Sequence, residues 1–350
     1  MQFHDLTISS VTHETPDSVA ISFDVPADLA DVFQYQPGQY LTIRHEIDGE
    51  ELRRSYSIAS GPHDPLTIGV KRVDGGIFST IAQQLKPGDT LQVSAPDGRF
   101  VLKDARRILL VAAGSGITPM VAIAAHALER GTNVTLIYGN RDTSHIMFRD
   151  RLEALKDKHL AEFSLIHVLS REEQDVPLLN GHVSGEKVIR LANAGVLDLA
   201  DTGAVYLCGP GEMIDDVQAH LLDHGVPPQS IHHERFAVEG APAPKPRSEA
   251  AESAAEAGVD VEVILDGSRR RFILTEADDT VLAAAARNGL ELPYSCKGGM
   301  CCTCRCRIAE GTAEMATNYS LEPWELEAGF TLACQTRPTS EKLVLDFDAA

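Results

Sequence analysis

Residues 296–304 read Cys-Lys-Gly-Gly-Met-Cys-Cys-Thr-Cys and place Cys296, Cys301 and Cys304 in the spacing C-x4-C-x2-C. A further cysteine, Cys334, lies beyond a segment of helical character. Two ferric ions with bridging sulfides need four thiolate ligands, and three of them on one tight loop can wrap such a cluster. The stretch therefore predicts a [2Fe–2S] cluster of the plant type in the C-terminal part of the chain.

The glycines of this loop support the same interpretation. Gly298 and Gly299 should allow strained φ values and point N–H groups at the sulfur atoms, which tunes the potential of a cluster. The alternative is a structural zinc site, which usually takes two C-x2-C pairs far apart in the chain. Only Cys301 and Cys304 form such a pair here, and Cys334 has no close neighbour in sequence.

The remaining cysteines of this region do not fit the ligand spacing. We expect Cys302 and Cys306 to be small apolar bystanders, although a ligand set with Cys306 in place of Cys334 stays open. The chain has 7 cysteines, an odd number, and most of them gather in residues 296–306. This clustering favours a metal site in a reducing compartment over a disulfide framework, so a cytoplasmic location is expected.

The charge of the chain bears on its partners. The formal net charge of -20 argues against nucleic acid and against anionic membrane surfaces. The first residues lack the basic and apolar regions of a signal peptide. Residues 108–128 contain no charged side chain, but glycines and Pro119 interrupt them. A buried strand, a turn and a helix explain this stretch better than a membrane span.

Composition divides the chain into parts. Residues 239–258 are rich in Ala, Pro, Glu and Ser and predict a flexible linker. The linker would let a C-terminal domain at residues 259–350 swing relative to the remainder. Before it, residues 1–103 show short alternating runs such as SVAISFDV and QYLTIRHEI, typical of an antiparallel β-barrel or sandwich. Residues 104–238 repeat strand, turn and helix, which predicts a doubly wound α/β domain with a parallel sheet.

A glycine-rich turn follows the first strand of this α/β domain. Gly114 and Gly116 would let a pyrophosphate approach the start of the next helix. Thr118 suits the N-cap of that helix, and Pro119 suits its first position. Pro119 also replaces the last glycine of G-x-G-x-x-G, so the motif alone is weak. Together these residues predict a dinucleotide site.

Two further strand ends refine this site. The second strand ends at Arg141 without the carboxylate that usually selects NAD, so NADPH is favoured through a contact of Arg141 with the 2′-phosphate. Asp142 beside it weakens this preference. The fourth strand ends in Cys208-Gly209-Pro210, where a nicotinamide could lie.

A hydride carries two electrons, whereas a [2Fe–2S] cluster accepts one at a time, so a flavin is needed between them. The N-terminal part offers candidates for its site. Arg54 could bind a phosphate, Tyr56 could stack on a ring, and Ser57 could hydrogen-bond near a ring nitrogen. Gly76 and Ser79 open a short helix that could face the same pyrophosphate.

In this order along one chain, the motifs resemble the ferredoxin–NADP reductase superfamily joined to a C-terminal plant-type ferredoxin. The resemblance implies a multidomain fold with a β-barrel FAD domain, an NADP domain and an α+β, β-grasp-like ferredoxin domain. It implies catalytic roles for Tyr56, Ser57 and Cys208, and four cluster ligands, with the fourth at Cys334. It implies cofactor binding by these residues: Arg54, Tyr56, Ser57, Gly76, Ser79, Gly114, Gly116, Thr118, Pro119, Arg141, Cys208, Gly209, Pro210, Glu234 and Phe236.

Within this superfamily, the doubled cysteine, the Asn-Tyr-Ser-Leu stretch and the Leu-x-Cys-Gln ending around Cys334 resemble the reductase subunits of phenylacetyl-CoA epoxidases. The resemblance implies electron flow from NADPH through FAD and the cluster to a di-iron oxygenase that epoxidises an aromatic acyl-CoA. Alternatives are a reductase of a steroid or ring hydroxylase, and a redox-sensing iron–sulfur module without turnover.

Overall fold

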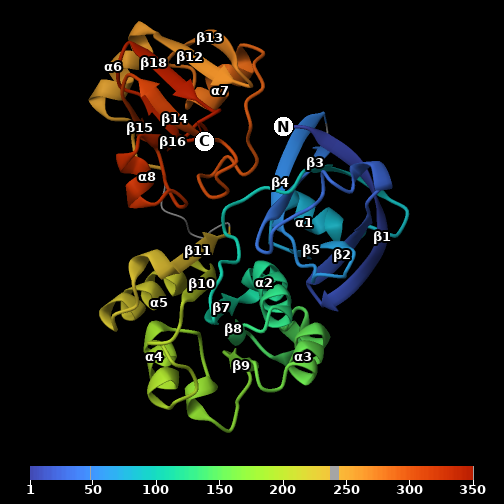
Figure 1. Cartoon of the computed structure of the whole chain (residues 1–350). Coiled ribbons are helices and arrows are strands. Elements are labelled where there is room, and N and C mark those ends of the chain that lie inside the picture. Colours follow the sequence, from blue (N-terminus) through green and yellow to red (C-terminus); the bar gives the residue numbers. More distant parts are fainter. Residues whose placement is uncertain (48, 237–243, 350) are drawn as a thin grey trace. The chain divides into compact units, whose positions relative to one another are not determined.

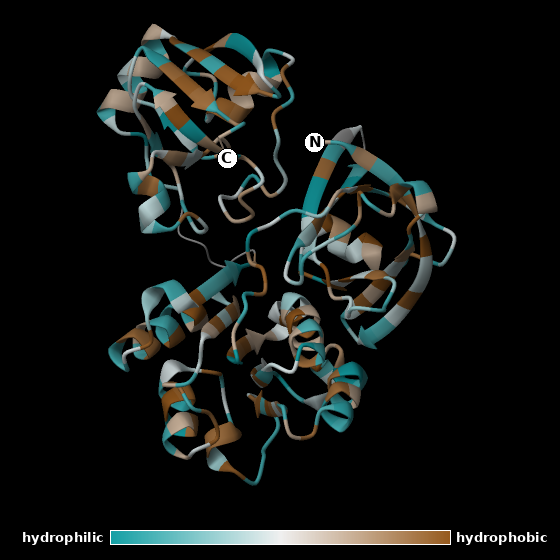
Figure 2. Ribbon diagram, in the orientation of Figure 1, coloured by the Kyte–Doolittle hydropathy of each residue, from teal (hydrophilic) through white to brown (hydrophobic). Residues whose placement is uncertain are grey.

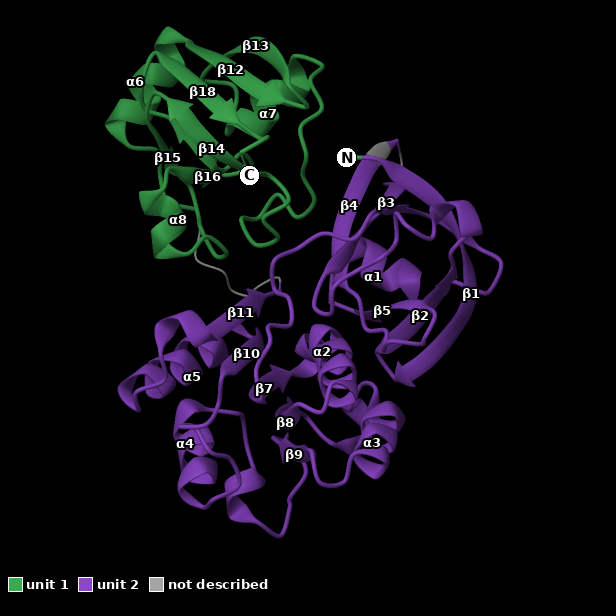
Figure 3. Ribbon diagram, in the orientation of Figure 1, with its two compact units in different colours: residues 1, 237–350 green, residues 2–236 purple. Residues whose placement is uncertain are grey.

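A computed structural model describes residues 1–47, 49–236 and 244–349. The chain forms two compact units, one comprising Gln2–Phe236 and the other containing Ala237–Ala350 (Figures 1 and 3). We call them the N-terminal unit and the C-terminal unit and describe each by itself.

The first half of the N-terminal unit is an antiparallel barrel. Its sheet has the order β4-β3-β6-β1-β2-β5, and a bridge between Ile58 and Ile68 joins the two outer strands. The barrel alternative of the sequence analysis is therefore confirmed over the sandwich. Its elements are β1 (Phe3–Thr15), β2 (Ser18–Asp24), β3 (Tyr40–Ile47), β4 (Glu50–Ser57), β5 (Leu66–Lys71), α1 (Ile77–Ala82) and β6 (Thr90–Ser94).

Alternating side chains fill the interior of this barrel. Val19, Ile21 and Phe23 of β2 are almost fully buried and share one apolar core with Leu91 and Val93 of β6. Because successive residues of a strand point to opposite faces, this spacing of apolar side chains commits one face of each strand to the interior.

The second half of the N-terminal unit is a parallel sheet with helices on both faces. The strand order is β11-β10-β7-β8-β9, and these neighbouring strands pair in parallel. The strands are β7 (Arg107–Ala113), β8 (Asn133–Asn140), β9 (Phe163–Leu169), β10 (Ala204–Gly209) and β11 (Ile231–Arg235). The helices are α2 (Ile117–Glu129), α3 (Arg149–Lys158), α4 (Gly185–Asn193) and α5 (Gly211–Asp223).

The central strand β7 shows why the sheet is covered on both sides. Ile108 and Leu110 belong to the apolar core that contains α2, whereas Leu109 and Val111 belong to the core that contains α4 and α5. The outer strand β11 is largely hydrophilic in Figure 2, as suits a partly buried strand at the edge of a sheet. The chain order reverses between β7 and β10, so this sheet has a topological switch point there.

The uncharged stretch at residues 108–128 is a buried strand, a turn and the helix α2, as predicted. In α2 nearly every side chain is buried, which explains the lack of charged residues without a bilayer. Among the residues that the structure describes, no helix is both long enough and apolar enough to cross a membrane.

The C-terminal unit has an α+β fold. Its main sheet has the order β13-β12-β18-β14-β16, with β12 and β18 parallel, and β15 pairs with β17. Helix α7 packs into the same apolar core as β12 and β18. The elements are β12 (Val259–Leu265), β13 (Ser268–Leu274), α7 (Val281–Arg287), β14 (Arg305–Glu310), β15 (Ala313–Met315), α8 (Pro323–Glu327), β16 (Phe330–Leu332), β17 (Thr336–Pro338) and β18 (Lys342–Asp346).

The predicted linker at residues 239–258 needs correction. Residues 239–243 lie outside the described residues, but the remainder is ordered on the C-terminal unit. Helix α6 (Glu249–Ala257) buries Ala254 and Ala255 in the core of this unit, and Ser248 caps it. The backbone N–H of Lys245 also donates to Ala316 O at 3.1 Å. Small alanines suffice for this packing, which is why a search for large apolar residues missed it.

A buried ion pair ties α8 to the strand that follows the cysteine loop. Arg305 Nε lies 2.8 Å from Glu325 Oε1, and their side chains are 10% and 0% exposed. The Arg305 guanidinium also lies 3.5 Å from the centre of the Phe330 ring. Because removal of one partner leaves a buried charge uncompensated, this pair is sensitive to single substitutions.

We predict that Glu325→Ala destabilises the C-terminal unit by about 3–5 kcal/mol. Denaturant unfolding followed by the visible absorbance of the cluster measures the change. The matched control is Glu310→Ala, which removes an exposed pair with Lys342 and should cost under about 1 kcal/mol. Equal effects of the two substitutions would contradict the importance of burial.

Candidate functional site

The four predicted cluster cysteines come together in the C-terminal unit. Their sulfur atoms form two contacting pairs, Cys296 with Cys301 and Cys304 with Cys334. Among the described residues, no three His, Cys, Asp or Glu side chains surround one common metal position. A two-iron cluster, in which each iron takes two thiolates, fits a paired arrangement.

Backbone N–H groups point at these sulfur atoms. Gly298 N lies 3.3 Å from Cys296 Sγ, and Cys296 N lies 3.5 Å from Cys301 Sγ. The Cys301 thiol and the nearby backbone N–H groups lower the pKa of Cys296 to about 5. On the fourth cysteine, Gln335 Nε2 donates to Cys334 Sγ at 3.5 Å. Such donors stabilise thiolates, the form in which cysteine binds iron.

The backbone of this loop is strained at Lys297, Gly299 and Cys302, which all have positive φ values. A Cβ at Gly299 would also lie only 3.3 Å from the Thr317 carbonyl oxygen. The prediction of strained φ is thus right for Gly299 and wrong for Gly298, whose role is to donate its N–H.

The bystander cysteine Cys306 points into the core from β14. It is fully buried, and burial raises the pKa of its thiol. Cys304 pairs with Cys334 rather than with Cys306. Cys302 is half-buried and packs against the same core.

The residues predicted for the flavin lie along β4 of the barrel. Tyr56 packs its ring 5.6 Å from the ring of Phe78 on α1, and burial raises the pKa of its hydroxyl. Arg54 is exposed, with one guanidinium nitrogen 2.8 Å from Arg53 O. An exposed guanidinium beside a half-buried ring is suited to a ligand with both phosphate and aromatic parts.

Ser79 holds the turn before α1 together. Its hydroxyl accepts from Val73 N at 3.2 Å and donates to Gly76 O at 3.3 Å. A Cβ at Gly76 would lie 2.4 Å from Ser79 Oγ. The Ser79 hydroxyl therefore fixes the shape of the turn that opens α1.

Ser57, Cys208 and Glu234 converge from three strands. Ser57 Oγ donates to Glu234 Oε2 at 3.1 Å, and Cys208 pairs in register with Glu234 across β10 and β11. Burial raises the pKa of Glu234 to about 7 and, with the nearby charge of Glu234, raises that of Cys208. Phe236 packs beside them against the core of α2. This cluster joins the barrel to the switch point of the parallel sheet.

The glycine turn after β7 differs from its predicted form. Residues Gly114–Gly116 form a 3₁₀ turn, so Gly116 occupies the N-cap of α2. The prediction of Thr118 as the N-cap is wrong, because its buried hydroxyl donates back to Ser115 O at 3.0 Å. Pro119 is the third residue of α2 and not the first as predicted, but it still lies within the first turn, where its missing N–H has no cost.

Gly116 is required by close packing. A Cβ at this position would lie 2.1 Å from the Cys208 carbonyl oxygen. The predicted nucleotide turn and the predicted Cys208-Gly209-Pro210 strand end are thus brought into contact. Pro210 then precedes α5, so two helices begin at this edge of the sheet.

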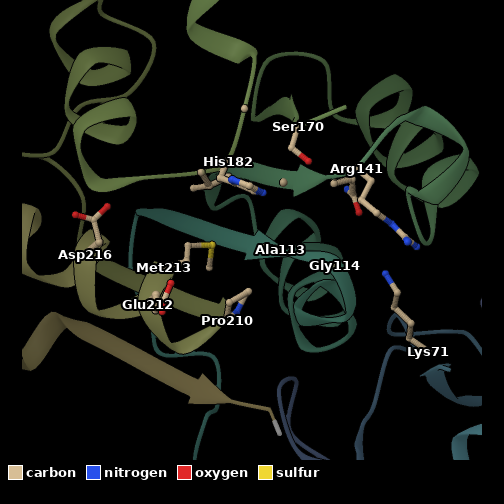
Figure 4. Close-up of a pocket in the computed structure, with 14 residues that line it drawn as sticks. Lys71, Ala113, Gly114, Arg141, Ser170, His182, Pro210, Glu212, Met213 and Asp216 are labelled. Carbon is tan, nitrogen blue, oxygen red and sulfur yellow. The ribbon is translucent and has the colours of Figure 1, made fainter. Parts of the chain in front are cut away.

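A pocket of about 550 Å³ opens at this edge (Figure 4). It is lined by Lys71, Ala113, Gly114, Gly139, Asn140, Arg141, Ser170, Gly181, His182, Val183, Pro210, Glu212, Met213 and Asp216. Lys71 comes from the barrel and Arg141 from the end of β8, and both contact Asp17 of the barrel. The sequence analysis missed Lys71 at the end of β5, and Ser170 and His182 in the segment after β9, because these stretches carry no recognisable motif.

Comparisons with known proteins support this geometry. Family models match an oxidoreductase FAD-binding domain at residues 5–102, an oxidoreductase NAD-binding domain at 110–219 and a 2Fe-2S iron-sulfur cluster binding domain at 263–339. The chain is 42% identical to one of the subunits of 1,2-phenylacetyl-CoA epoxidase from Escherichia coli (strain K12), over 99% of this chain and 98% of that protein.

A second relative is the ferredoxin reductase component of 3-ketosteroid-9-alpha-monooxygenase from Rhodococcus rhodochrous, 35% identical over 98% of this chain and 96% of that protein. The solved structure of phthalate dioxygenase reductase has the same fold, with a TM-score of 0.61, 24% identity and coverage of 99% and 98% of the two chains. The chain belongs to the ferredoxin–NADP reductase family.

Membership of this family confirms several predictions. This reductase is a flavin and iron–sulfur oxidoreductase that uses FAD, NAD(P)H and a [2Fe–2S] cluster and transfers electrons to an oxygenase. The multidomain fold is confirmed as well. The zinc site and the redox-sensing module without turnover are set aside. The roles of single residues and the exact domain boundaries stay predictions.

We predict that Cys334→Ala abolishes the visible absorbance of the cluster in this reductase, whereas Cys306→Ala retains it. Cys334 pairs with Cys304, and Cys306 lies in the core as a buried side chain. Absorbance and iron content per chain measure the difference. Loss of the cluster from Cys306→Ala alone would support the alternative ligand set.

We predict that the stability of the N-terminal unit falls as the pH rises from about 4.5 to 7, because of Glu234. In this window the folded state keeps the Glu234 proton and the unfolded state releases it, so higher pH favours unfolding. Glu234→Gln removes this pH-dependent contribution to the free energy of unfolding. Its melting temperature should exceed that of the unsubstituted chain by at least about 2 °C at pH 8 but not at pH 5. A difference of equal size at both pH values would contradict the raised pKa.

Proposed function

We propose that this protein is the NADPH-dependent reductase component of a di-iron oxygenase that epoxidises phenylacetyl-CoA. The observation that carries the proposal is the 42% identity to the Escherichia coli 1,2-phenylacetyl-CoA epoxidase component over nearly the whole length of both chains. Similarity of this extent includes all three domains and the cysteine loop.

The residues predicted to bind FAD would have separate roles. When bound, FAD accepts a hydride and releases single electrons. Arg54 would bind its phosphate, and Tyr56 would stack on its ring. Ser57 and Glu234 would lie beside the reacting atoms, because their side chains meet at 3.1 Å where the barrel joins the parallel sheet. Gly76 and Ser79 would shape the turn beneath the pyrophosphate.

The nucleotide would occupy the pocket at the switch point. Gly114 and Gly116 would face its pyrophosphate, and Thr118 and Pro119 would support the helix behind them. Cys208, Gly209 and Pro210 would lie against the nicotinamide. Open α/β sheets bind ligands at such an edge.

The preference for NADPH is supported by the charges at the end of β8. Arg141 and Lys71 line the same side of the pocket, whereas Glu212 and Asp216 come from α5 on another side (Figure 4). A guanidinium and an ammonium group suit the additional 2′-phosphate of NADPH.

The four cysteines would hold the cluster as the exit of the electron path. Cys296 and Cys301 would bind one iron, and Cys304 and Cys334 the other, following the observed sulfur pairs. A cytoplasmic location fits this chemistry, since the thiols must stay reduced before the cluster is assembled.

A second candidate is the reductase component of a steroid oxygenase. It is favoured by the 35% identity to the 3-ketosteroid-9-alpha-monooxygenase component over 98% of this chain. Its acceptor would be a different oxygenase, while the internal electron path would be the same.

Reconstitution with purified oxygenase components tests the proposal. We predict that this chain supports NADPH-driven oxidation of phenylacetyl-CoA by the epoxidase oxygenase component, and that kcat/KM for NADPH exceeds that for NADH at least about tenfold. Substrate consumption and NADPH oxidation should rise together. The 3-ketosteroid oxygenase component with its steroid serves as the matched control.

Two results would contradict the proposal separately. Faster coupled turnover with the steroid component would show that the steroid oxygenase is the better acceptor, and would leave the proposed path from NADPH to the cluster unchanged. Equal or better use of NADH would overturn the nucleotide preference alone.

A further inference from the structure

The turn between β1 and β2 reaches from the barrel to the nucleotide half of the N-terminal unit. Glu14 Oε2 accepts from Phe148 N at 2.9 Å, where Phe148 begins α3 with a left-handed backbone. Three residues later, Asp17 contacts Arg141 and Lys71. This turn, residues 14–18, therefore lies at the nucleotide pocket although it belongs to the flavin barrel.

Asp17 is held in a fixed geometry. Thr15 Oγ1 donates to Asp17 Oδ1 at 2.8 Å, and Arg72 N donates to Asp17 O at 2.7 Å. The other carboxylate oxygen, Oδ2, accepts from Arg141 Nη2 at 2.6 Å and lies 3.9 Å from Lys71 Nζ. One oxygen is thus committed to the turn, and the other faces both cations.

The two cations lie between Asp17 and the pocket. Lys71 and Arg141 line the pocket, whereas Asp17 does not, and its side chain is 16% exposed. Figure 4 shows the nitrogen atoms of Lys71 and Arg141 directed toward one another from different elements. Arg141 remains 39% exposed, so further N–H groups of its guanidinium are available to a ligand.

The ionisation of these groups agrees with the geometry. Burial alone would raise the pKa of Asp17, but the hydrogen bond from Thr15 and the charges of Lys71 and Arg141 bring it below its ordinary value. Burial lowers the pKa of Lys71, Asp17 opposes this, and Arg141 adds to it. The Asp17 carboxylate therefore lies beside two basic side chains, Lys71 and Arg141.

We infer that Asp17 is a specificity-determining counter-ion, which competes with the 2′-phosphate of NADPH for Arg141 and so limits the affinity for NADP⁺. This inference rests on the proposed contact between Arg141 and the 2′-phosphate and adds a residue of the flavin barrel to it. A reductase must release NADP⁺ in each cycle, and the Asp17 carboxylate would weaken the binding of that product.

Two contributions of opposite sign decide whether the loss of the Asp17 charge strengthens or weakens the binding of NADP⁺. A phosphate that binds Arg141 lies within the width of one guanidinium from Asp17, where repulsion between like charges is strong near a protein surface. Against this, loss of Asp17 would free the Arg141 side chain and leave Arg141 and Lys71 to repel one another, and a bound phosphate would offset both costs. Substitution by asparagine keeps the shape and one accepting oxygen, which can face Arg141. The amide nitrogen then takes the place of Oδ1 beside Thr15 Oγ1, which can accept from it, so the main change is the loss of the charge.

The experiment compares the full chain with Asp17→Asn by calorimetric titration with NADP⁺ and with NAD⁺. We expect the Kd for NADP⁺ to fall about tenfold and the Kd for NAD⁺ to change less than about twofold. The gain should shrink as salt is raised from about 0.01 M to about 1 M, because ions screen the charges.

Asp64→Asn is the matched control. Asp64 of the barrel pairs with Arg151 of α3, and neither residue lines the pocket. This substitution removes a charge and an ion pair from the same junction, but we expect no change in the ratio of the two Kd values. A change as large as that from Asp17→Asn would show a general effect of charge and overturn the inference.

A double-mutant cycle tests the route through Arg141. In an Arg141→Ala background, Asp17→Asn should change the Kd for NADP⁺ less than about twofold, because the guanidinium for which Asp17 and the 2′-phosphate compete is absent. A full tenfold gain in that background would overturn the inference, as would weaker or unchanged binding of NADP⁺ to Asp17→Asn. An equal fall in the Kd for NADP⁺ and for NAD⁺ would also overturn the inference. The effect would then come from the pyrophosphate that both nucleotides share, and not from the 2′-phosphate.

The inference and the proposed NADPH preference can fail separately. Equal affinities of the unsubstituted chain for NADP⁺ and NAD⁺ would contradict the preference. If Asp17→Asn then binds NADP⁺ selectively, the counter-ion role stands, because the carboxylate alone was suppressing the selectivity.

Discussion

The close contact between the turn after β7 and the end of β10 is the constraint on which the N-terminal unit depends. Only a glycine fits at position 116, since a Cβ would lie 2.1 Å from the Cys208 carbonyl oxygen. This contact closes the switch point of the sheet and brings the start of α2 beside the end of β10. Cys208 then lies next to Glu234 in register, and Glu234 meets Ser57 of the barrel.

The barrel and the parallel sheet contribute to one site because polar groups join them at several points. Ser57 contacts Glu234, Glu14 caps the backbone of Phe148, and Asp17 pairs with Arg141. These hydrogen bonds are partly buried and need a defined geometry, because a partner left unsatisfied away from water is costly. A flavin bound to one half and a nucleotide bound to the other would therefore be held in a fixed relation.

Local patterns in the sequence predicted the features that arise within a few residues. The cysteine spacing, the alternation of strands and helices and the glycine turn all depend on neighbours along the chain. The prediction of Thr118 as the N-cap was wrong because a 3₁₀ turn at Gly114–Gly116 makes Gly116 the N-cap of α2. The Asp17–Arg141 pair could not be predicted, since 124 positions separate its members. Helix α6 was missed because alanines pack well without large side chains.

An acidic chain that binds a polyanionic nucleotide must concentrate its cations locally. The net charge is -20, yet Lys71 and Arg141 come from two different domains to one side of the pocket. Glu212 and Asp216 line another side of the same pocket, so the local placement of the two cations, and not the net charge of the lining, would attract a phosphate. The two cations would also repel one another, and the carboxylate of Asp17 between them offsets that repulsion. The same carboxylate reduces the positive potential that a phosphate would meet. Asp17 would therefore stabilise the site without nucleotide and weaken the binding of nucleotide.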